Sequence, residues 1–328
     1  IGARVVPKNY GVSPRSYLLR NDGNGSWTDI TPKRLKKAGM ITDATFTDYN
    51  NDGRDELILV GKWMPVMVLK KENGALVFDK QIDESEGWWT SITPIALNGD
   101  TGTHFILGNW GTNSRYSASP EKPLSLHMND FDGDEQIDFV ISSHYMNGQI
   151  STPVATYRTL SSEFPAITSR VPSHQQYAYK AIEDIFTDSQ LRGVKTKKAV
   201  TLQSSILVNK NGSFTIKALP IEAQIAPVYS TITRDFNGDG VTDLLLLGNQ
   251  YDVKPDVGRL GSNHGVVLLL DENLNSRFVP YRQTGNRIKG EIRDAATFTI
   301  DGDGYLLVGR NDANLSLYKM GSLTKSEK

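Results

Sequence analysis

The chain has 328 residues, 38% of them hydrophobic, and its 36 lysines and arginines nearly balance its 37 aspartates and glutamates. That apolar content is enough for one large core or two smaller ones, so we expect a folded protein. The balanced charge creates no net field toward nucleic acid or an anionic membrane, so neither is an expected partner. Cysteine is absent, which excludes a disulfide framework, a thiolate metal site and a cysteine nucleophile.

The ends of the chain and its apolar runs bear on export and membranes. No apolar run reaches the length that crosses a bilayer, so we expect no membrane insertion. The chain opens at Ile1 without a methionine or a signal-peptide pattern. This predicts a mature or truncated product, from which an export signal could have been removed.

Two local patterns recur along the chain. One is a hairpin with an Asn-Gly turn, at residues 16–28 and 205–215, because such turns supply the positive φ that a tight hairpin needs. Looser hairpins are expected at residues 66–78 and 266–278. The other pattern is a strand, an Asp-rich loop and an apolar strand. In chain order, the first strands of such units are predicted at residues 42–47, 90–96, 125–129, 230–234 and 294–299.

Together the two patterns predict an all-β fold, a β-propeller. Each unit consists of an inner strand, an Asp loop, a second strand and a hairpin of two outer strands, which is a four-stranded blade. Five inner strands, with two more blades implied by the hairpins at residues 16–28 and 205–215, give about seven blades in a single domain over residues 1–328. The segment before Ser16 has no recognisable inner strand, so either the C-terminal strands complete the first blade or the chain is truncated at its N-terminus.

One stretch departs from the β pattern. Residues 173–176 (SHQQ) have the spacing of a helix capping box, and apolar residues then recur at helical intervals up to Phe186. We therefore expect a helical insertion between blades at residues 158–197.

Three Asp loops have the composition of a calcium site. Calcium prefers six to eight oxygen ligands, and alternating acidic side chains on a tight loop supply them at positions 1, 3, 5 and 9, with a backbone carbonyl oxygen at position 7. The predicted ligands are Asp48, Asn50, Asp52, Arg54 and Glu56 in the first loop; Asp130, Asp132, Asp134, Gln136 and Asp138 in the second; and Asp235, Asn237, Asp239, Val241 and Asp243 in the third. We expect two to three structural Ca²⁺ ions.

Two other structures could explain the composition of these loops, an EF-hand and a simple turn. An EF-hand requires a glutamate at position 12, where this chain has Leu59, Ile141 or Leu246 within an apolar strand. Alternatively, Asp, Asn and Gly are simply good turn formers, but three copies with an acid at position 9 favour calcium. The second loop fits least well, because Glu135 occupies the glycine position and a side chain at positive φ costs about 1 kcal/mol.

The Asp loops resemble FG-GAP and VCBS repeats, as in the propellers of integrin α-subunits, and this resemblance covers most of the chain. Shorter segments, such as residues 61–65 (GKWMP) and 108–111 (GNWG), resemble bacterial VCBS-repeat proteins related to the ASPIC/UnbV and cartilage-acidic-protein group. The resemblance implies an integrin-like, exported protein that is secreted, periplasmic or on the cell surface. It also implies further repeats before the present first residue.

A ligand is expected on the face opposite the Asp loops. In a propeller the loops after each second strand converge there, and aromatic rings beside amide and guanidinium groups suit sugars or an extended peptide. The candidate residues are Arg4, Arg15, Trp63, Asn109, Trp110, Asn113, Arg115, His144, Tyr145, Gln250, Tyr251, Arg310 and Asn311. The alternative is that Trp63 and Trp110 pack between blades, since tryptophans are commonly partly buried.

Two functions from different classes remain open at this point. The first is a non-catalytic binding or adhesion module for glycan or protein ligands, with calcium in a structural role. The second is a calcium-dependent polysaccharide lyase or hydrolase, because fold alone does not exclude catalysis. The sequence contains no GxSxG, HExxH or P-loop motif, which favours the binding module.

Overall fold

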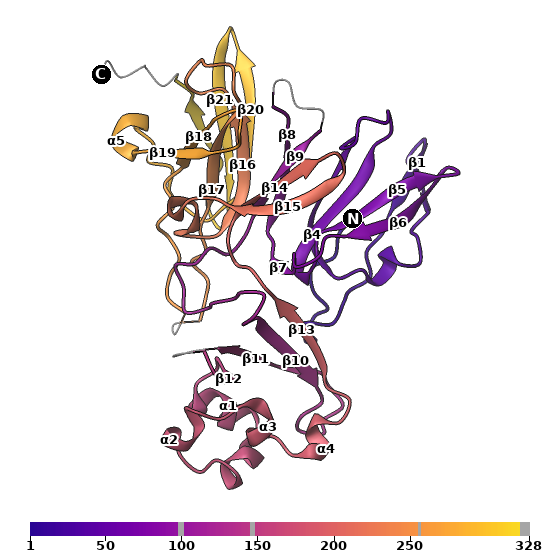
Figure 1. Ribbon diagram of the computed structural model, residues 1–328, viewed down its shortest axis with the longest axis vertical. Helices are drawn as coiled ribbons and strands as arrows, with labels where there is room; N and C mark the ends of the chain where they lie inside the picture. The colour runs from indigo at the N-terminus through magenta and orange to yellow at the C-terminus, as the bar shows by residue number, and fades with distance from the viewer. Residues whose placement is uncertain (98–101, 145–147, 255–256, 322–328) are drawn as a thin grey trace.

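The computed structural model describes residues 1–97, 102–144, 148–254 and 257–321. Antiparallel sheets dominate it, and helices gather in one part of the chain (Figure 1). A short hairpin, β1 (Leu19–Gly23) and β2 (Ser26–Asp29), opens the chain. The 3₁₀ turn η1 (Leu35–Lys37) then leads into the first blade. The described helices include none long and apolar enough to cross a membrane.

The first blade is a meander of four strands. It contains β3 (Met40–Thr47), β4 (Glu56–Met64), β5 (Met67–Glu72) and β6 (Ala75–Gln81), and the short strand β7 (Gly87–Trp88) pairs with the end of β4. Strand β4 is buried almost throughout, as expected of an apolar strand that is covered on both faces.

Two further blades follow the same plan. The second blade contains β8 (Ser91–Ile95), β9 (His104–Gly108), β14 (Ser205–Lys210) and β15 (Ser213–Ala218). The turn η3 (Ile221–Gln224) leads to the third blade, which contains β16 (Val228–Arg234), β17 (Asp243–Gly248), β18 (Val266–Leu270) and β19 (Ser276–Val279). The short helix α5 (Tyr281–Thr284) then precedes a three-stranded sheet of β20 (Ile292–Ile300), β21 (Asp303–Arg310) and β22 (Ser316–Lys319).

The first strands of these four sheets lie beside one another in the order β3, β8, β16 and β20 (Figure 1). Buried clusters fill the spaces between neighbouring sheets: one joins Ile106 of β9 to Leu246 of β17, and another joins Leu245 of β17 to Leu306 of β21. This radial packing of antiparallel sheets around their first strands is a propeller arrangement. The predicted all-β propeller is therefore confirmed.

The number of blades differs from the seven expected. Over the described residues, three four-stranded blades and one three-stranded sheet share the radial arrangement. The hairpin at residues 205–215 is not a separate blade, because β14 pairs with β9 and completes the second blade. The strand expected at residues 125–129 also belongs elsewhere, in a sheet inserted between β9 and β14.

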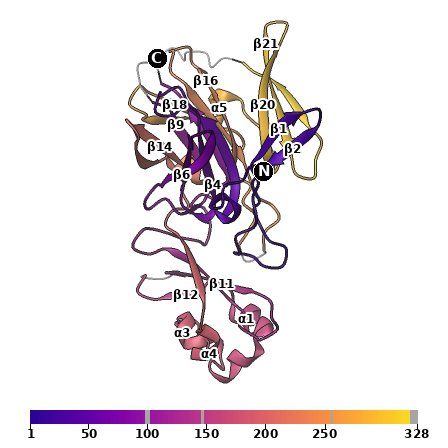
Figure 2. The same cartoon turned by 90° about the vertical axis from the view of Figure 1, so that its right-hand side faces the viewer.

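This inserted sheet contains β12 (Ser151–Pro153), β11 (Asp138–His144), β10 (Leu124–Asn129) and β13 (Lys195–Ala199), in that order. The helical turns α1 (Tyr157–Glu163), η2 (Pro165–Ser169), α2 (His174–Tyr177), α3 (Ile182–Ile185) and α4 (Asp188–Leu191) connect β12 to β13. The sheet and its helices form a body at one end of the blades (Figure 2). The helices thus form the connection between two strands of the inserted sheet. The sequence predicts them instead as an insertion between blades.

The capping signal that predicted the helical segment is present. The Ser173 hydroxyl accepts a hydrogen bond from the Gln176 backbone N–H at 3.3 Å, which satisfies one of the free donors at the start of α2. Phe164 and Phe186 pack with Phe131, which lies in the second Asp loop; their ring centroids are 5.8 and 4.4 Å from that of Phe131. The helices are therefore anchored to the sheet through this loop.

A glycine lies near the end of the second strand in each of the four radial sheets: Gly61, Gly108, Gly248 and Gly309. At Gly61 and Gly248, an added Cβ would collide with the backbone carbonyl of a residue at the start of the inner strand, Met40 or Pro227. The inner strand is irregular there in three of the sheets, since the pairing register shifts at Ile41, Val228 and Ile292. The residues that follow Gly61, Gly108 and Gly248 are thus equivalent positions of the repeat, whereas in the fourth sheet Arg310, not Gly309, pairs with the residue before the register shift.

Candidate functional site

The three Asp loops share one hydrogen-bonding scheme. In each, the aspartate at position 1 accepts hydrogen bonds from backbone N–H groups of the turn. Asp48 accepts from Asp52 and Gly53 at 3.0 and 2.8 Å. Asp235 accepts from Gly238, Asp239 and Gly240 at 2.6 to 3.3 Å, and Asp130 accepts from Gly133, Asp134 and Glu135 at 2.7 to 3.1 Å. The repeated scheme shows that the loops are three copies of one structure.

The side chain at position 5 orders the second half of each loop. Asp52, Asp134 and Asp239 each accept a hydrogen bond from the backbone N–H two residues on, at 2.8 to 3.0 Å. The donors are Arg54, Gln136 and Val241, the residues predicted to supply an oxygen at position 7. Glu135, in the glycine position of the second loop, has φ of 66°, which confirms that this loop carries a strained residue.

The acid at position 9 stands at the start of the second strand; it is buried in the first and third loops and half-buried in the second. Asp243 is fully buried, and its carboxylate accepts hydrogen bonds from Phe236 N at 2.9 Å and Leu270 N at 3.0 Å. Glu56 is 3% exposed, and its Oε2 atom has no hydrogen-bond partner among the described residues. Asp138 accepts a hydrogen bond from Phe131 N at 3.0 Å.

The protonation of these acids reflects their surroundings. Burial, followed by the nearby Asp52 carboxylate, raises the pKa of Glu56 to about 7. Burial also raises the pKa of Asp138 and Asp243, although backbone N–H groups partly oppose it. A cation among these oxygens would remove the repulsion between neighbouring carboxylates.

The donor set fits a hard cation. Carboxylate oxygens of Asp130, Asp132 and Asp138 all lie within 4.8 Å of one another, and oxygen ligands of this kind are those that calcium prefers. In the first loop the free Oε2 of Glu56 is an acceptor without a donor. The three carboxylates of the second loop are therefore close enough together to contact a single cation.

The end of the blades away from the first and third Asp loops contains a cluster of aromatic rings, against which Ile137 of the second loop packs. The Trp88 ring centroid lies 5.0 Å from that of Trp63, 5.5 Å from that of Trp110 and 5.0 Å from that of Tyr116. The same buried cluster includes Leu126 of β10. The inserted sheet therefore packs against this end of the blades (Figure 1).

Trp63 and Trp110, both predicted ligand residues, are 3% and 8% exposed. Trp63 adopts a left-handed backbone with φ of 58°, and its Nε1–H donates to the Tyr10 hydroxyl at 2.9 Å. Their burial matches the packing role that the sequence left open, so neither ring presents a face on which a sugar could stack.

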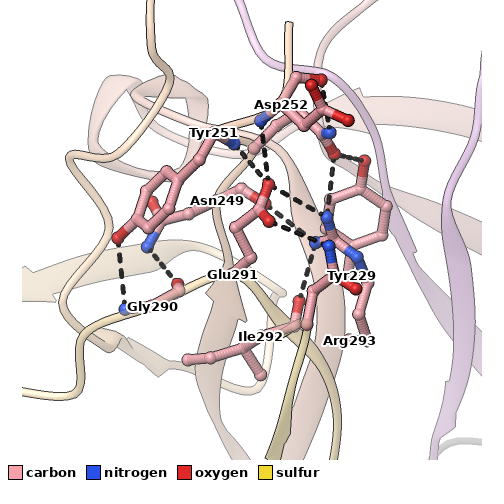
Figure 3. Close-up of polar contacts among 10 residues, drawn as sticks. Tyr229, Asn249, Tyr251, Asp252, Gly290, Glu291, Ile292 and Arg293 are labelled. Atoms are coloured by element: carbon pink, nitrogen blue, oxygen red, sulfur yellow. Dashed lines mark hydrogen bonds and ion pairs between the residues drawn. The ribbon is translucent and has the colours of Figure 1, made fainter. Parts of the chain in front are cut away.

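Beside the aromatic rings lies a polar network centred on Glu291 (Figure 3). The Glu291 carboxylate accepts hydrogen bonds from Tyr251 N, from Asp252 N at 3.3 Å and from Asn311 Nδ2 at 3.1 Å. It also pairs with Arg293 at 3.2 Å. Burial alone would raise the pKa of Glu291, but these hydrogen bonds and the guanidinium together lower it.

Arg293 extends the network across neighbouring sheets. Its guanidinium donates to Gln250 Oε1 and to the Asn249 carbonyl, both at 3.0 Å, and it lies 4.3 Å from the Tyr229 ring centroid. The sequence candidates Gln250, Tyr251 and Asn311 are thus brought together, but by Glu291 and Arg293, which the sequence did not identify. The sequence does contain a signal for Glu291 and Arg293: they are a charged pair that flanks an apolar residue, Ile292, at the start of an inner strand.

The other predicted ligand residues are dispersed. Arg15 pairs with Asp29 at 2.9 Å beside the first hairpin, and Arg4 is exposed. Asn109 is fully buried, Asn113 donates to the Ile225 carbonyl at 3.0 Å and Arg115 donates to the Val154 carbonyl at 2.7 Å. His144 is half-buried at the end of β11, Arg310 donates to Ser316 and Tyr318, and Tyr145 lies outside the described residues.

Comparisons with known proteins agree with the repeat. The family model of the FG-GAP-like repeat matches residues 9–59, which include the first Asp loop. Residues 9–59 thus contain an FG-GAP-like repeat, in a chain whose antiparallel sheets pack radially as the blades of a β-propeller. No curated protein matches the chain.

Among solved structures, one described as the Dos1 propeller is similar at 10% sequence identity and a TM-score of 0.35. The similarity covers 95% of this chain and 63% of that one. The chain thus spans less than two thirds of the length of that propeller, and a similarity at this level assigns no residue and no activity.

Proposed function

We propose that this protein is a calcium-stabilised propeller that acts outside the cytoplasm as a non-catalytic binding or adhesion module. The FG-GAP-type propeller supports a binding module in general. The observation that carries the calcium proposal is the threefold repetition of one hydrogen-bonded Asp loop that ends in an acid at the start of a strand, buried in the first and third copies.

Calcium would act here on the fold. Asp48, Asp130 and Asp235 already have their carboxylates oriented by backbone N–H groups, while Glu56 and Asp243 are buried next to other acids. A divalent cation supplies the positive charge that these groups lack, and its binding free energy adds to the stability of the folded state alone. The ligand, a glycan or a protein, would bind away from the first and third Asp loops, at the end of the blades where Glu291 and Lys62 lie.

Adding calcium to EGTA-treated protein should raise the midpoint of thermal unfolding, followed by circular dichroism. At a calcium concentration about 30 times the dissociation constant, each site should add about 2 kcal/mol of stability. Magnesium should not reproduce the shift, because it requires a smaller octahedral site. Asp235→Ala should reduce the shift.

Asp271→Ala is the matched control. Asp271 also caps a turn, accepting hydrogen bonds from Asn273 N at 2.9 Å and Asn275 N at 2.8 Å, but it lies outside the Asp loops. This variant should retain the whole calcium response. An unchanged midpoint in the wild-type protein would show that the loops are turns only, and the proposal would be withdrawn.

A further inference from the structure

The residues after Gly61, Gly108 and Gly248 can be compared directly, because they occupy equivalent places in three sheets. Asn249 is fully buried, and its Nδ2 donates to the carbonyls of Asn263 at 2.8 Å and Gly290 at 2.9 Å. Asn109 is fully buried and similarly reaches backbone carbonyls. Two blades therefore use this position to tie their loops together.

Lys62 departs from this role. It follows Gly61 and pairs across the strands with Trp88, yet its ammonium makes no hydrogen bond or ion pair with any described residue. The Nζ atom instead lies 5.7 Å from the ring centroid of Trp88 and 5.4 Å from that of Trp110. Lys62 is only half-buried, so solvent and small solutes can reach it.

The two rings contribute donors of their own. Trp88 and Trp110 are 5% and 8% exposed, and the Nε1–H of each is buried without an acceptor among the described residues. By contrast, Trp63 donates to Tyr10 at 2.9 Å and Trp89 donates to the Ser85 carbonyl at 2.7 Å. A buried donor without a partner costs about 1 to 3 kcal/mol. The Lys62 ammonium and the two indole N–H groups are thus three neighbouring donors without an acceptor among the described residues.

The charges that act on Lys62 are also positive. Burial, together with Arg4 of the N-terminal segment and Arg293 of β20, lowers the pKa of Lys62 to about 8. Arg293 is paired with Glu291 at 3.2 Å (Figure 3), which leaves Arg4 and Lys62 as the uncompensated cations. At neutral pH the surroundings therefore favour a negatively charged ligand.

We propose that Lys62, with the indole N–H groups of Trp88 and Trp110 and with Arg4 nearby, binds an anionic group of the ligand, a carboxylate or a phosphate. This inference specifies the chemistry of the ligand and rests on the proposed function as a binding module. It does not depend on calcium in the Asp loops.

The test is a titration of the whole chain with acetate, glucuronate and inorganic phosphate at constant ionic strength and pH 7. Affinity is measured by isothermal titration calorimetry, and the indole N–H signals are followed by ¹H–¹⁵N NMR. Binding should shift the signals of Trp88 and Trp110, whereas Trp27, which is 58% exposed on β2, should not respond. A response to acetate and glucuronate identifies a carboxylate, and a response to phosphate alone identifies a phosphate.

Lys62→Gln should weaken anion binding by about tenfold or more, because a charged hydrogen-bond donor is lost. Arg20→Gln removes an exposed arginine of β1 and should leave the affinity unchanged. In the wild-type protein the affinity should fall by about tenfold between pH 7 and pH 9, as Lys62 loses its proton. This pH dependence tests the role of Lys62 even if a variant does not fold.

The proposal is overturned if none of the three anions shifts Trp88 or Trp110, or if Lys62→Gln binds as well as the wild type. Repeating the titration in EGTA separates the two proposals. Anion binding that persists while calcium gives no thermal shift refutes the calcium proposal alone, and the reverse result refutes the anion site alone.

Discussion

Asp243→Ala should lower the free energy of unfolding by about 3 kcal/mol, even in EGTA. Asp243 is fully buried, and its two carboxylate oxygens accept hydrogen bonds from Phe236 N and Leu270 N. Phe236 belongs to the Asp loop and Leu270 ends β18, so one side chain joins the loop to the neighbouring strand of the third blade. Alanine would leave both buried N–H groups without acceptors.

Urea denaturation in EGTA measures this loss directly. Asp271→Ala is again the control, because Asp271 caps an exposed turn, and its removal should cost less than about 1 kcal/mol. The loss of unfolding free energy in Asp243→Asn should lie between those of Asp243→Ala and Asp271→Ala, since the amide retains one acceptor oxygen. Equal stability of Asp243→Ala and Asp271→Ala would contradict a structural role for the acid at position 9.

Glu291→Ala should destabilise the protein by about 2 to 3 kcal/mol, because it removes the acceptor of three hydrogen bonds and the counter-charge of a partly buried arginine. The side chain of Glu291 is 7% exposed and that of Arg293 is 33% exposed. Glu291→Gln should cost less, since the amide oxygen still accepts from Tyr251 N. Asp252→Ala is the control, because among the described contacts only the Asp252 backbone takes part in the network.

The pH dependence of stability provides a second readout for Glu291. Its folded-state pKa is below the ordinary glutamate value of 4.5, so the ionised side chain stabilises the fold above that pH. This contribution should be lost as the pH falls through the folded-state pKa. The stability difference between wild type and Glu291→Gln should therefore be largest near pH 7 and shrink below about pH 4. A difference that stays constant over this range would exclude the ionised carboxylate as the cause.

Local patterns predicted the blade elements well because each depends on neighbouring residues. The Asp loop that begins at Asp235 combines turn-forming residues with an acid at a fixed spacing, and the structure shows its carboxylate bound to three backbone N–H groups. The hairpin β14–β15 has its turn at Asn211, whose φ is 52°, as the Asn-Gly pair required. Calcium in the loops stays a prediction.

Pairing between distant segments was not predictable in the same way. The segment between β9 and β14 interrupts the second blade, and β14 pairs with β9 only after the inserted sheet and its helices. A strand in the inserted sheet has the same alternation of apolar residues as a strand in a blade. The pattern at residues 125–129 therefore predicts the inner strand of a further blade. Sequence periodicity indicates that a strand is half-buried, but it does not indicate which sheet contains the strand.

The sequence by itself determined the repeated Asp loops, the hairpins and the all-β class, because turn chemistry and side-chain alternation act over a few residues. Only the tertiary structure decided which polar residues act together. Glu291 joins Tyr251, Arg293 and Asn311, and Lys62 is placed between Trp88 and Trp110, through contacts among separate sheets. Burial and the loss of water give these contacts their strength, and both depend on the packing of the whole chain.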